Sequence, residues 1–317
     1  MTTDPPHRSF RTVALVGRYQ TAGVAGTLAE IALFLQGRGL SVVLESGTAQ
    51  AIGRTDLPNA PTAELAGTAD LAVVVGGDGT MLGVARELAA SGLPLVGINH
   101  GRLGFMTDVP LSRWREALGQ ILEGRYQSEC RMLLTARVMR GDETVFSATA
   151  LNDVVVARGA LGRMVEVVVH VDGLYMYTQR ADGLVVATPT GSTAYALSAN
   201  GPILHPRLAG IVLAPIAPQS LSNRPIVLPD ASRISIRVSE SRDALVNCDM
   251  QSFVELATGD TIEVARMPSA IEFLHPPGWS YFATLRQKLN WHAMPADRDA
   301  AADRDVADRD DAPDVYA

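Results

Sequence analysis

The residues best suited to chemistry are the Gly-Gly-Asp-Gly sequence at 76–79, which directly follows the apolar run 71–75. Glycine adopts backbone angles closed to other residues, and it has no side chain to keep a ligand away from backbone N–H groups, which bind anions. Residues 80–88 follow with helical spacing, so the loop is expected to face a helix N-terminus, where phosphate is favoured. The predicted phosphate loop consists of Gly76, Gly77, Gly79 and Thr80.

Asp78 is the residue that a simple phosphate loop does not explain, because phosphate groups repel a carboxylate. Its presence is accounted for if it binds a sugar hydroxyl, holds Mg²⁺ or removes a proton. The Walker pattern G-x-x-x-x-G-K-[ST] is absent and the only lysine is Lys288, so Walker-type chemistry is excluded. The loop misses the dinucleotide pattern G-x-G-x-x-G by one residue. Dinucleotide binding by this loop alone, or a glycine turn with an incidental aspartate, is the weaker interpretation.

A second unusual stretch, residues 188–195, packs four hydroxyl side chains, a glycine and Tyr195 together after an apolar strand. Such residues suit a ligand with many oxygens, and a tyrosine ring packs on another ring or on a ribose. Clusters of serine and threonine also form ordinary turns, so the stretch alone does not establish binding. Two polar pairs lie beside apolar strands and are weak signals when taken singly: Asn152 with Asp153, and Asp182 with Gly183.

The elements expected around the glycine loop alternate between strands and helices. The apolar patterns predict strands at 11–17, 40–44, 71–75 and 93–98, and helices at 27–37, 80–88 and 111–122. This alternation favours a doubly wound parallel sheet, in which ligands bind outside the carboxyl ends of the strands. The glycine loop lies at such an end.

From about residue 128 the hydrophobic pattern changes to a period of two, which is typical of antiparallel strands. Residues 165–171 alternate, Asp172 and Gly173 supply a two-residue hairpin turn, and residues 174–177 return. The sequence therefore predicts α/β and β parts: a doubly wound N-terminal α/β domain at 8–127 with 276–294, a mainly antiparallel β domain at 128–275, and a disordered tail at 295–317 that repeats Ala-Asp-Arg-Asp.

Composition excludes several classes of protein. The chain has 317 residues, 47% of them hydrophobic, which suits two domains of ordinary size, or one large one, with a substantial core. A net charge of −7 argues against nucleic acid as the main ligand. No apolar run spans a bilayer and no signal peptide is evident, so a soluble, cytoplasmic protein without a membrane partner is expected. The two cysteines and six histidines show no metal-binding spacing, so no protein metal site is predicted.

Five segments together resemble the NAD kinase family, in the order in which that family has them. The match covers most of the chain. The glycine loop alone also admits diacylglycerol and sphingosine kinases or phosphofructokinases, whereas the five segments in order do not. Two small departures are Met106, where leucine is usual, and Asp153, where glutamate is common. The segments are GGDGT at 76–80, NHGRLGFMTD at 99–108, Asn152 with Asp153, TPTGSTAY at 188–195, and LRQKLNW at 285–291.

The resemblance implies transfer of the γ-phosphoryl group of ATP, or of inorganic polyphosphate in some members, to the 2′-hydroxyl of the adenosine ribose of NAD. Asp78 would be the general base on that hydroxyl. The resemblance also implies that the last helix packs back on the first domain. The residues that it implies for NAD binding are Asp78, Gly79, Asn152, Asp153, Arg163, Arg180, Asp182, Thr193, Ala194, Tyr195, Ala196, Leu197, Ser198 and Gln251.

The expected metal is Mg²⁺, held mainly by nucleotide phosphates and water, because the sequence contains no carboxylate cluster that would form a cage. The family suggests a homo-oligomer, either a dimer or a tetramer. Two other functions are open on the residues alone. A different kinase with the same loop, acting on a lipid or sugar phosphate, gives no reason for residues 188–195. A dinucleotide-binding regulatory module gains nothing from the charge of Asp78.

Overall fold

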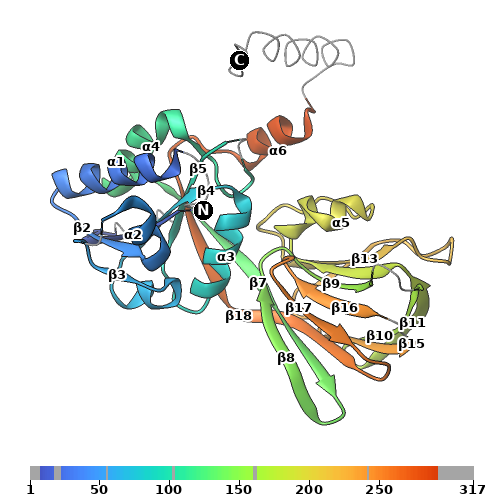
Figure 1. The fold of residues 1–317 in the computed structure, drawn as a ribbon. Coiled ribbons are helices and arrows are strands. Elements are labelled where there is room, and N and C mark those ends of the chain that lie inside the picture. The colour runs from blue at the N-terminus through green and yellow to red at the C-terminus, as the bar shows by residue number, and fades with distance from the viewer. Residues whose placement is uncertain are drawn as a thin grey trace, which may run out of the picture.

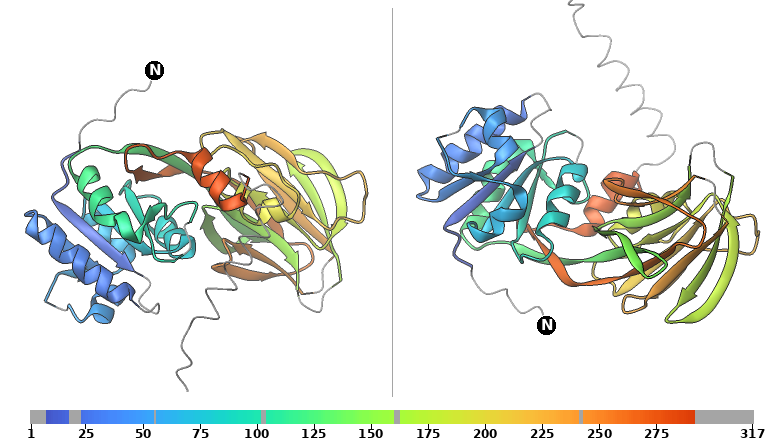
Figure 2. Two further views of the ribbon diagram at one scale, coloured as in Figure 1. Left: turned by 90° about the horizontal axis from the view of Figure 1, so that it is seen from above. Right: turned by 60° about the horizontal axis from the view of Figure 1, so that its bottom comes forward.

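The computed structural model describes residues 8–17, 23–54, 56–101, 104–159, 163–240 and 243–291. These residues form an α/β lobe, on the left of Figure 1, and a β-rich lobe on the right. Two long strands run from one lobe into the other, and Figure 2 shows the same connection from two further directions. No helix in the described part of the chain is long and apolar enough to cross a membrane.

The first lobe contains parallel strands in the order β3–β2–β1–β4–β5, with helices on both faces. One apolar core lies under α1, α2 and α4, and another lies under α3 and the short helix η1. Because the sheet is covered on both faces, its strands are continuous apolar runs, and the predicted doubly wound sheet is confirmed. The bounds are β1 (Thr12–Gly17), α1 (Val24–Gly37), β2 (Ser41–Glu45), α2 (Ser46–Ile52), β3 (Asn59–Ala60), η1 (Thr62–Gly67), β4 (Leu71–Gly76), α3 (Asp78–Leu88), β5 (Leu95–Asn99), β6 (Val109–Pro110), η2 (Leu111–Arg113) and α4 (Trp114–Leu122).

The second lobe consists of two mainly antiparallel sheets that face each other across an apolar core. One sheet has the order β14–β13–β12–β9–β16–β17, and the other contains β7, β8, β10, β11, β15 and β18. The prediction that this domain is mainly antiparallel β is thus confirmed. The strands are β7 (Gln127–Arg140), β8 (Glu143–Ala150), β9 (Asp153–Arg158), β10 (Val165–Val171), β11 (Leu174–Ala181), β12 (Gly183–Ala187), β13 (Gly210–Ile216), β14 (Ile226–Pro229), β15 (Ile234–Glu240), β16 (Ala244–Cys248), β17 (Ser252–Leu256) and β18 (Thr261–His275).

Two turns of this lobe show what can and cannot be predicted from the local sequence pattern. The predicted hairpin turn at Asp172 and Gly173 is present, with φ angles of 52° and 78° as a two-residue turn of the primed type requires. Thr258, Gly259 and Asp260, which the sequence pattern predicts as a break between two strands, do separate β17 and β18, but these strands do not pair with each other. Strand β17 pairs with β16, whereas β18 pairs with β7 and β15 in the opposite sheet.

Strands β7 and β18 join the two lobes. They pair along most of their length, and Phe273 of β18 also pairs with Leu95 of β5, so one sheet continues from the parallel strands into the β-rich lobe. Leu133 and Ile271, on these strands, pack in the core beneath α3. The domain boundaries at 127/128 and 275/276 stay a prediction, and the tail at 295–317 lies outside the described residues.

Two short helical segments complete the junction. Helix α5 (Tyr195–Ser198), preceded by η3 (Gly191–Thr193), covers the outer face of the six-stranded sheet. Helix α6 (Tyr281–Leu289) lies between the lobes in Figures 1 and 2. Its Lys288 Nζ lies 5.6 Å from the ring centroid of Phe105, and its Tyr281 hydroxyl donates to Leu204 O at 3.3 Å. The last helix therefore packs back on the first lobe, as predicted, and also touches the second.

Candidate active site

The glycine loop lies at the carboxyl end of β4, and it leads directly into α3. Strands β1 and β4 are neighbours, and the chain order of the sheet reverses between them, so the loop lies at the topological switch point. The first main-chain hydrogen bonds of α3 run from Thr80 N and Met81 N to Gly77 O, at 3.0 and 3.1 Å. The N–H groups of Asp78 and Gly79 precede these bonds, at the positive end of the helix dipole. The predicted helix N-terminus is confirmed.

The glycines of this loop are explained by space and not by backbone angle. None of Gly76, Gly77 and Gly79 has a positive φ, so the expectation that they adopt angles closed to other residues is wrong. A Cβ at Gly76 would come within 2.7 Å of Thr80 Oγ1. A Cβ at Gly77 or Gly79 would meet no described atom within 4 Å. These two positions therefore leave open space beside the backbone N–H groups.

Asp78 is held by the turn at residues 105–107. Its Oδ2 accepts from Phe105 N at 2.7 Å, and its Oδ1 accepts from Met106 N at 3.0 Å and Thr107 N at 3.1 Å. The Thr107 hydroxyl also donates to Oδ1, at 3.2 Å. A carboxylate oxygen accepts about two hydrogen bonds, so among the described contacts Oδ1 is saturated and Oδ2 has room for one more.

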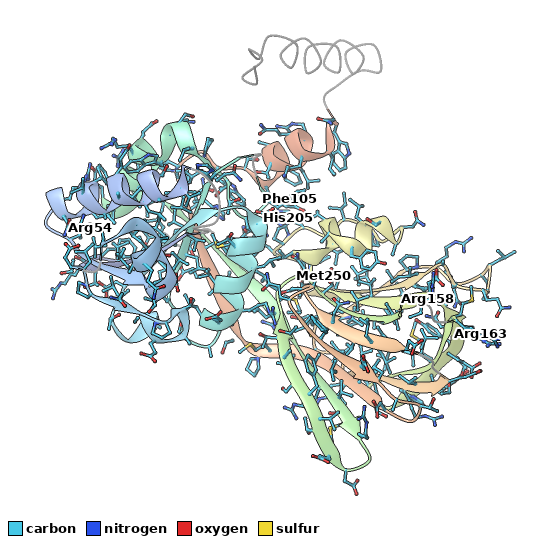
Figure 3. All side chains as sticks on the ribbon, in the orientation of Figure 1. Arg54, Phe105, Arg158, Arg163, His205 and Met250 are labelled. Atoms are coloured by element: carbon cyan, nitrogen blue, oxygen red, sulfur yellow. The ribbon has the colours of Figure 1, made fainter. Side chains whose placement is uncertain are left out.

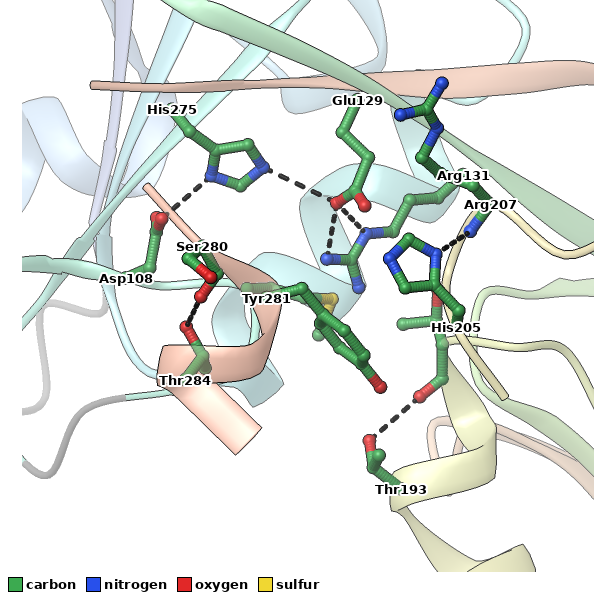
Figure 4. Close-up of polar contacts among 12 residues, drawn as sticks. Asp108, Glu129, Arg131, Thr193, His205, Arg207, His275, Ser280, Tyr281 and Thr284 are labelled. Carbon is green, nitrogen blue, oxygen red and sulfur yellow. Dashed lines mark hydrogen bonds and ion pairs between the residues drawn. The ribbon is translucent and has the colours of Figure 1, made fainter. Parts of the chain in front are cut away.

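A buried cluster of charged side chains follows this turn at Asp108, where the lobes meet (Figure 4). His275 Nδ1 lies 2.8 Å from Asp108 Oδ2, and His275 Nε2 lies 3.5 Å from Glu129 Oε2. Arg131 donates to Glu129 Oε2 from Nε at 2.9 Å and from Nη2 at 2.7 Å. All four side chains are almost fully buried. Asp108 directly follows the residues that bind Asp78. The cluster links it to His275 on β18 and, through His275, to Glu129 and Arg131 on β7.

The protonation of His275 balances the charge of this cluster. Burial lowers the pKa of His275, but the hydrogen bonds to Asp108 and Glu129 outweigh burial, so that the pKa is raised above its usual value. Protonated His275 and Arg131 then face two carboxylates, which is the balance that buried ions require. Trp279 stacks on the imidazole with ring centroids 3.9 Å apart. The segment that holds Asp78 is thus anchored on its far side.

Across the junction, Asp249 shapes the segment that contains Asn152 and Asp153. Its carboxylate accepts from the main-chain N–H groups of Leu151, Asn152 and Asp153, at 2.7, 2.8 and 3.0 Å. Thr188 N donates to Asn152 O at 2.9 Å, so the 188–195 stretch lies directly on this segment. A Cβ at Gly191 would come within 2.0 Å of Asn152 O, which explains the glycine. The two predicted motifs form one surface.

Asp153 has the most strongly shifted acid group of this surface. Burial and the charge of Asp249 raise the pKa of Asp153 to about 7, although Tyr195 N donates to its carboxylate and opposes the shift. The same hydrogen bond places the start of α5 against β9. Tyr195 itself is 40% exposed, so its ring is available to a ligand.

We expect the Asp153→Asn variant to flatten the pH dependence of stability. In the folded state Asp153 binds a proton that the unfolded chain, with a pKa near 3.9, releases. Its contribution to the free energy of unfolding is therefore fully present below about pH 4 and is lost as the pH rises through about 7. Melting temperatures measured between about pH 5 and pH 8 should fall by roughly 3–8 °C more in the wild type than in the variant. Asp142→Asn, in the exposed β7–β8 turn, is the control, and equal pH slopes in wild type and Asp153→Asn would contradict the shift.

Gln251 connects this surface to the glycine loop. Its Nε2 donates to Gly79 O at 3.0 Å, and its Oε1 accepts from Arg86 Nη1 at 3.1 Å. In Figure 3, Met250, which precedes Gln251 in the sequence, and Phe105, which binds Asp78, lie where the two lobes meet. The structure thus brings together Asp78, Gly79, Asn152, Asp153, Tyr195 and Gln251.

Arg180 and Asp182 lie farther out along the β-rich lobe. Arg180 pairs with Glu166 and Glu240 at 3.7 and 3.6 Å, and Asp182 accepts from Arg158 Nε at 2.8 Å. The end of β13 and the loop after it bond to both residues, since Gln219 N donates to Arg180 O and Asp182 N donates to Ile216 O. This loop and Ser198 line a cavity of 630 Å³. These residues suit the far half of a long ligand that starts at Asp78.

Arg163 is not brought to Asp78 within one chain. It is exposed just before β10, and Figure 3 places it at the outer end of the β-rich lobe, far from Phe105. Its predicted contact with NAD stays a prediction.

Sequence reasoning missed Asp249 and Arg86, which position the site without being part of a recognised motif, and it gave no role to Gly104 within the segment 99–108. Asp249 and Met250 form the tight turn between β16 and β17 with φ of 54° and 56°, and an Asp-Met pair is no signal for such a turn. The cue for Arg86 was a cation inside an otherwise apolar helix face. Among the described residues there is no group of three His, Cys, Asp or Glu side chains that could hold a metal ion.

Known proteins resemble the chain in both lobes. Residues 13–126 match the ATP-NAD kinase N-terminal domain, and residues 151–275 match the ATP-NAD kinase C-terminal domain. The NAD kinase of Burkholderia pseudomallei is 58% identical over 287 residues, which are 90% of this chain and 96% of that protein. The NAD kinase of Cupriavidus pinatubonensis is 56% identical over 288 residues, or 91% and 94% of the two chains.

Solved structures agree with these matches. An NAD kinase from Archaeoglobus fulgidus in complex with ATP has a TM-score of 0.71 at 28% identity, covering 88% of this chain and 98% of that one. Yeast NADH kinase complexed with NADH has a TM-score of 0.83 at 24% identity, covering 90% and 89%, and supports the fold. The chain belongs to the ATP-NAD kinase family.

Proposed function

We propose that the chain transfers the γ-phosphoryl group of ATP to the 2′-hydroxyl of the adenosine ribose of NAD, giving NADP and ADP. Membership of the family makes the chain a phosphotransferase with NAD as acceptor. The observation that supports this reaction best is the position of Asp78, which starts α3 and whose Oδ2, among the described contacts, has one acceptor site left beside the exposed Gly79. Inorganic polyphosphate is the alternative donor.

Asp78 is the proposed general base. Oδ2 accepts the proton of the 2′-hydroxyl as the oxygen attacks phosphorus, while Oδ1 stays bound to Met106 N and Thr107 N. Phosphoryl transfer has a loose transition state, so deprotonation is needed only late and a carboxylate suffices. The rigid turn at 105–107 keeps Asp78 in line, and correct placement is the main contribution to such a reaction.

The donor phosphates are proposed to lie at the N-terminus of α3, beside Gly77 and Gly79, where the N–H groups and the helix dipole favour negative charge. The acceptor is proposed to lie along Asn152, Asp153 and α5, with its far half toward Arg180 and Asp182. Support comes from the hydrogen bonds that join residues 151–153, 188 and 195 into one surface.

A divalent ion fits this site only as a companion of the donor phosphates. The described residues contain no cluster of carboxylates that could hold the ion, so the donor phosphates and water would be its ligands, which is a usual environment for Mg²⁺. Mg²⁺ bound in this way would neutralise charge on the phosphates. The chain's own residues position the donor and remove the proton.

The chain is also proposed to be cytoplasmic and homo-oligomeric. Two free cysteines and no disulfide among the described residues suit a reducing compartment. Exposed apolar side chains on the edge strands of the six-stranded sheet, Ile226 on β14 and Phe253 on β17, suit contacts between copies.

The test is a coupled assay in which purified protein, NAD, ATP and Mg²⁺ are incubated and NADP is measured with an NADP-specific dehydrogenase. NADP formation that requires ATP or polyphosphate is expected, and parallel reactions with NADH test the acceptor. Thermal stabilisation by NAD without ADP formation under any donor would point to a binding module and overturn the proposal.

A further inference from the structure

Arg86 connects the two lobes through hydrogen bonds from all three nitrogens of its guanidinium group. It lies on α3, two turns after Asp78, and its side chain is 11% exposed. Nε donates to Thr149 O at 2.7 Å, Nη1 to Gln251 Oε1 at 3.1 Å, and Nη2 to Ser252 Oγ at 2.7 Å. All three acceptors belong to the β-rich lobe. The guanidinium group is planar and donates in several directions, so its bonds to these acceptors fix both the distance and the orientation of α3 relative to the β-rich lobe.

The partners of Arg86 lead to both halves of the site. Gln251, which Arg86 orients, donates to Gly79 O in the glycine loop. Asp249 Oδ2 lies 3.7 Å from Arg86 Nε, its side chain is fully buried, and it holds the main chain at Leu151, Asn152 and Asp153. Arg86 is thus the cation beside a buried carboxylate, and its loss would leave Asp249 without that cation.

We propose that Arg86 is a positioning residue that holds the glycine loop at a fixed distance from the Asn152 and Asp153 segment. It thereby sets how the acceptor ribose meets Asp78. This inference rests on the proposed reaction, but it concerns a residue outside the surface that contacts substrate. Transfer between two bound nucleotides is sensitive to small displacements, so a loosened junction lowers turnover even in a folded enzyme.

The experiment compares Arg86→Lys and Arg86→Gln with Arg113→Gln, which removes an exposed arginine paired with Glu116. Lysine keeps the charge beside Asp249 but cannot reach Thr149, Gln251 and Ser252 at once. For each folded variant the kcat, the KM for NAD and ATP, the melting temperature, and the Kd of NAD by calorimetry are measured.

We expect Arg86→Lys to recover most of the melting temperature that Arg86→Gln loses, while its kcat stays on the order of 10–100-fold below wild type and its Kd for NAD is weakened several-fold. Arg113→Gln should stay within about twofold of wild type in every quantity. If Arg86→Gln does not fold, Arg86→Lys decides the question.

Two results would overturn the inference: wild-type kcat and Kd in folded Arg86→Gln, or full recovery of kcat by lysine, which would reduce the role to charge alone. A wild-type enzyme that binds NAD but forms no NADP would count against the proposed function. In that case the NAD titrations still decide the role of Arg86, because a Kd unchanged by Arg86→Lys would contradict it.

Discussion

Asp78→Asn is expected to lower turnover by a factor on the order of 10²–10⁴ while leaving the affinity for NAD close to wild type. The amide cannot accept the ribose proton. Its oxygen can still take the place of Oδ1 and accept from Met106 N and Thr107 N, but its NH₂ group then faces Phe105 N, which also donates. We therefore expect a modest loss of melting temperature together with the large loss of kcat. NADP formation and NAD calorimetry measure the two effects separately.

Thr107→Val is the matched comparison for this variant. It removes one donor to Oδ1 but leaves the carboxylate and all three main-chain donors in place. Its turnover should fall by less than about tenfold, because the base is intact. Near-normal turnover in Asp78→Asn would rule out the base role. Equal losses in Asp78→Asn and Thr107→Val would assign the effect to the disturbed turn instead.

The fold of the first lobe could be predicted from the sequence because its central strands β1, β4 and β5 are buried on both faces. Runs such as 71–75 then contain no polar residue, and their ends are marked by glycine. Strand β5 begins at Leu95, two residues later than predicted, after Pro94, which has no N–H to donate. Such small errors do not change the topology.

How the two lobes are joined could not be predicted from the sequence. The long strands β7 and β18 are each part of both lobes, and their pairing links residues more than 100 positions apart. Local periodicity reports which face of a strand is buried but not which strand lies beside it. For that reason the turn at 258–260 was visible in the sequence, whereas the change of sheet between β17 and β18 was not.

The site residues also fall into two groups, those that could be predicted from the sequence and those that could not. Residues proposed to touch the ligand stand in motifs, since Asp78, Gly79, Asn152, Asp153 and residues 193–198 could be named from their order along the chain. Residues that hold these motifs in place bond to partners far away in the sequence: Asp249 binds the main chain of Asn152, and Arg86 binds Gln251 across the junction of the lobes. Their chemistry is ordinary, and only their spatial partners give them importance.

Gly104→Ala is expected to abolish most activity without unfolding the protein. A Cβ at this position would lie 2.0 Å from Asp78 Oδ1 and 2.3 Å from Thr107 Oγ1, far inside any allowed contact. Gly104 N also donates to Thr107 O at 3.1 Å, so the glycine belongs to the turn that holds Asp78. The methyl group must therefore displace the carboxylate or the turn. Because Gly104 lies outside the apolar cores, the melting temperature should fall by only a few degrees.

The expected kcat of Gly104→Ala is lower than wild type by a factor on the order of 10² or more, since the base leaves its position. Gly26→Ala, in α1 where an added Cβ meets no atom of the described residues within 4 Å, is the control and should keep full activity. The double variant Gly104→Ala with Asp78→Asn should be little slower than Asp78→Asn alone, because both changes remove the same function. Additive losses in the double variant, or normal turnover in Gly104→Ala, would show that the position of Asp78 does not limit the reaction. Gly104 would then be needed for packing alone, and the case for Asp78 as the base would lose its geometric support.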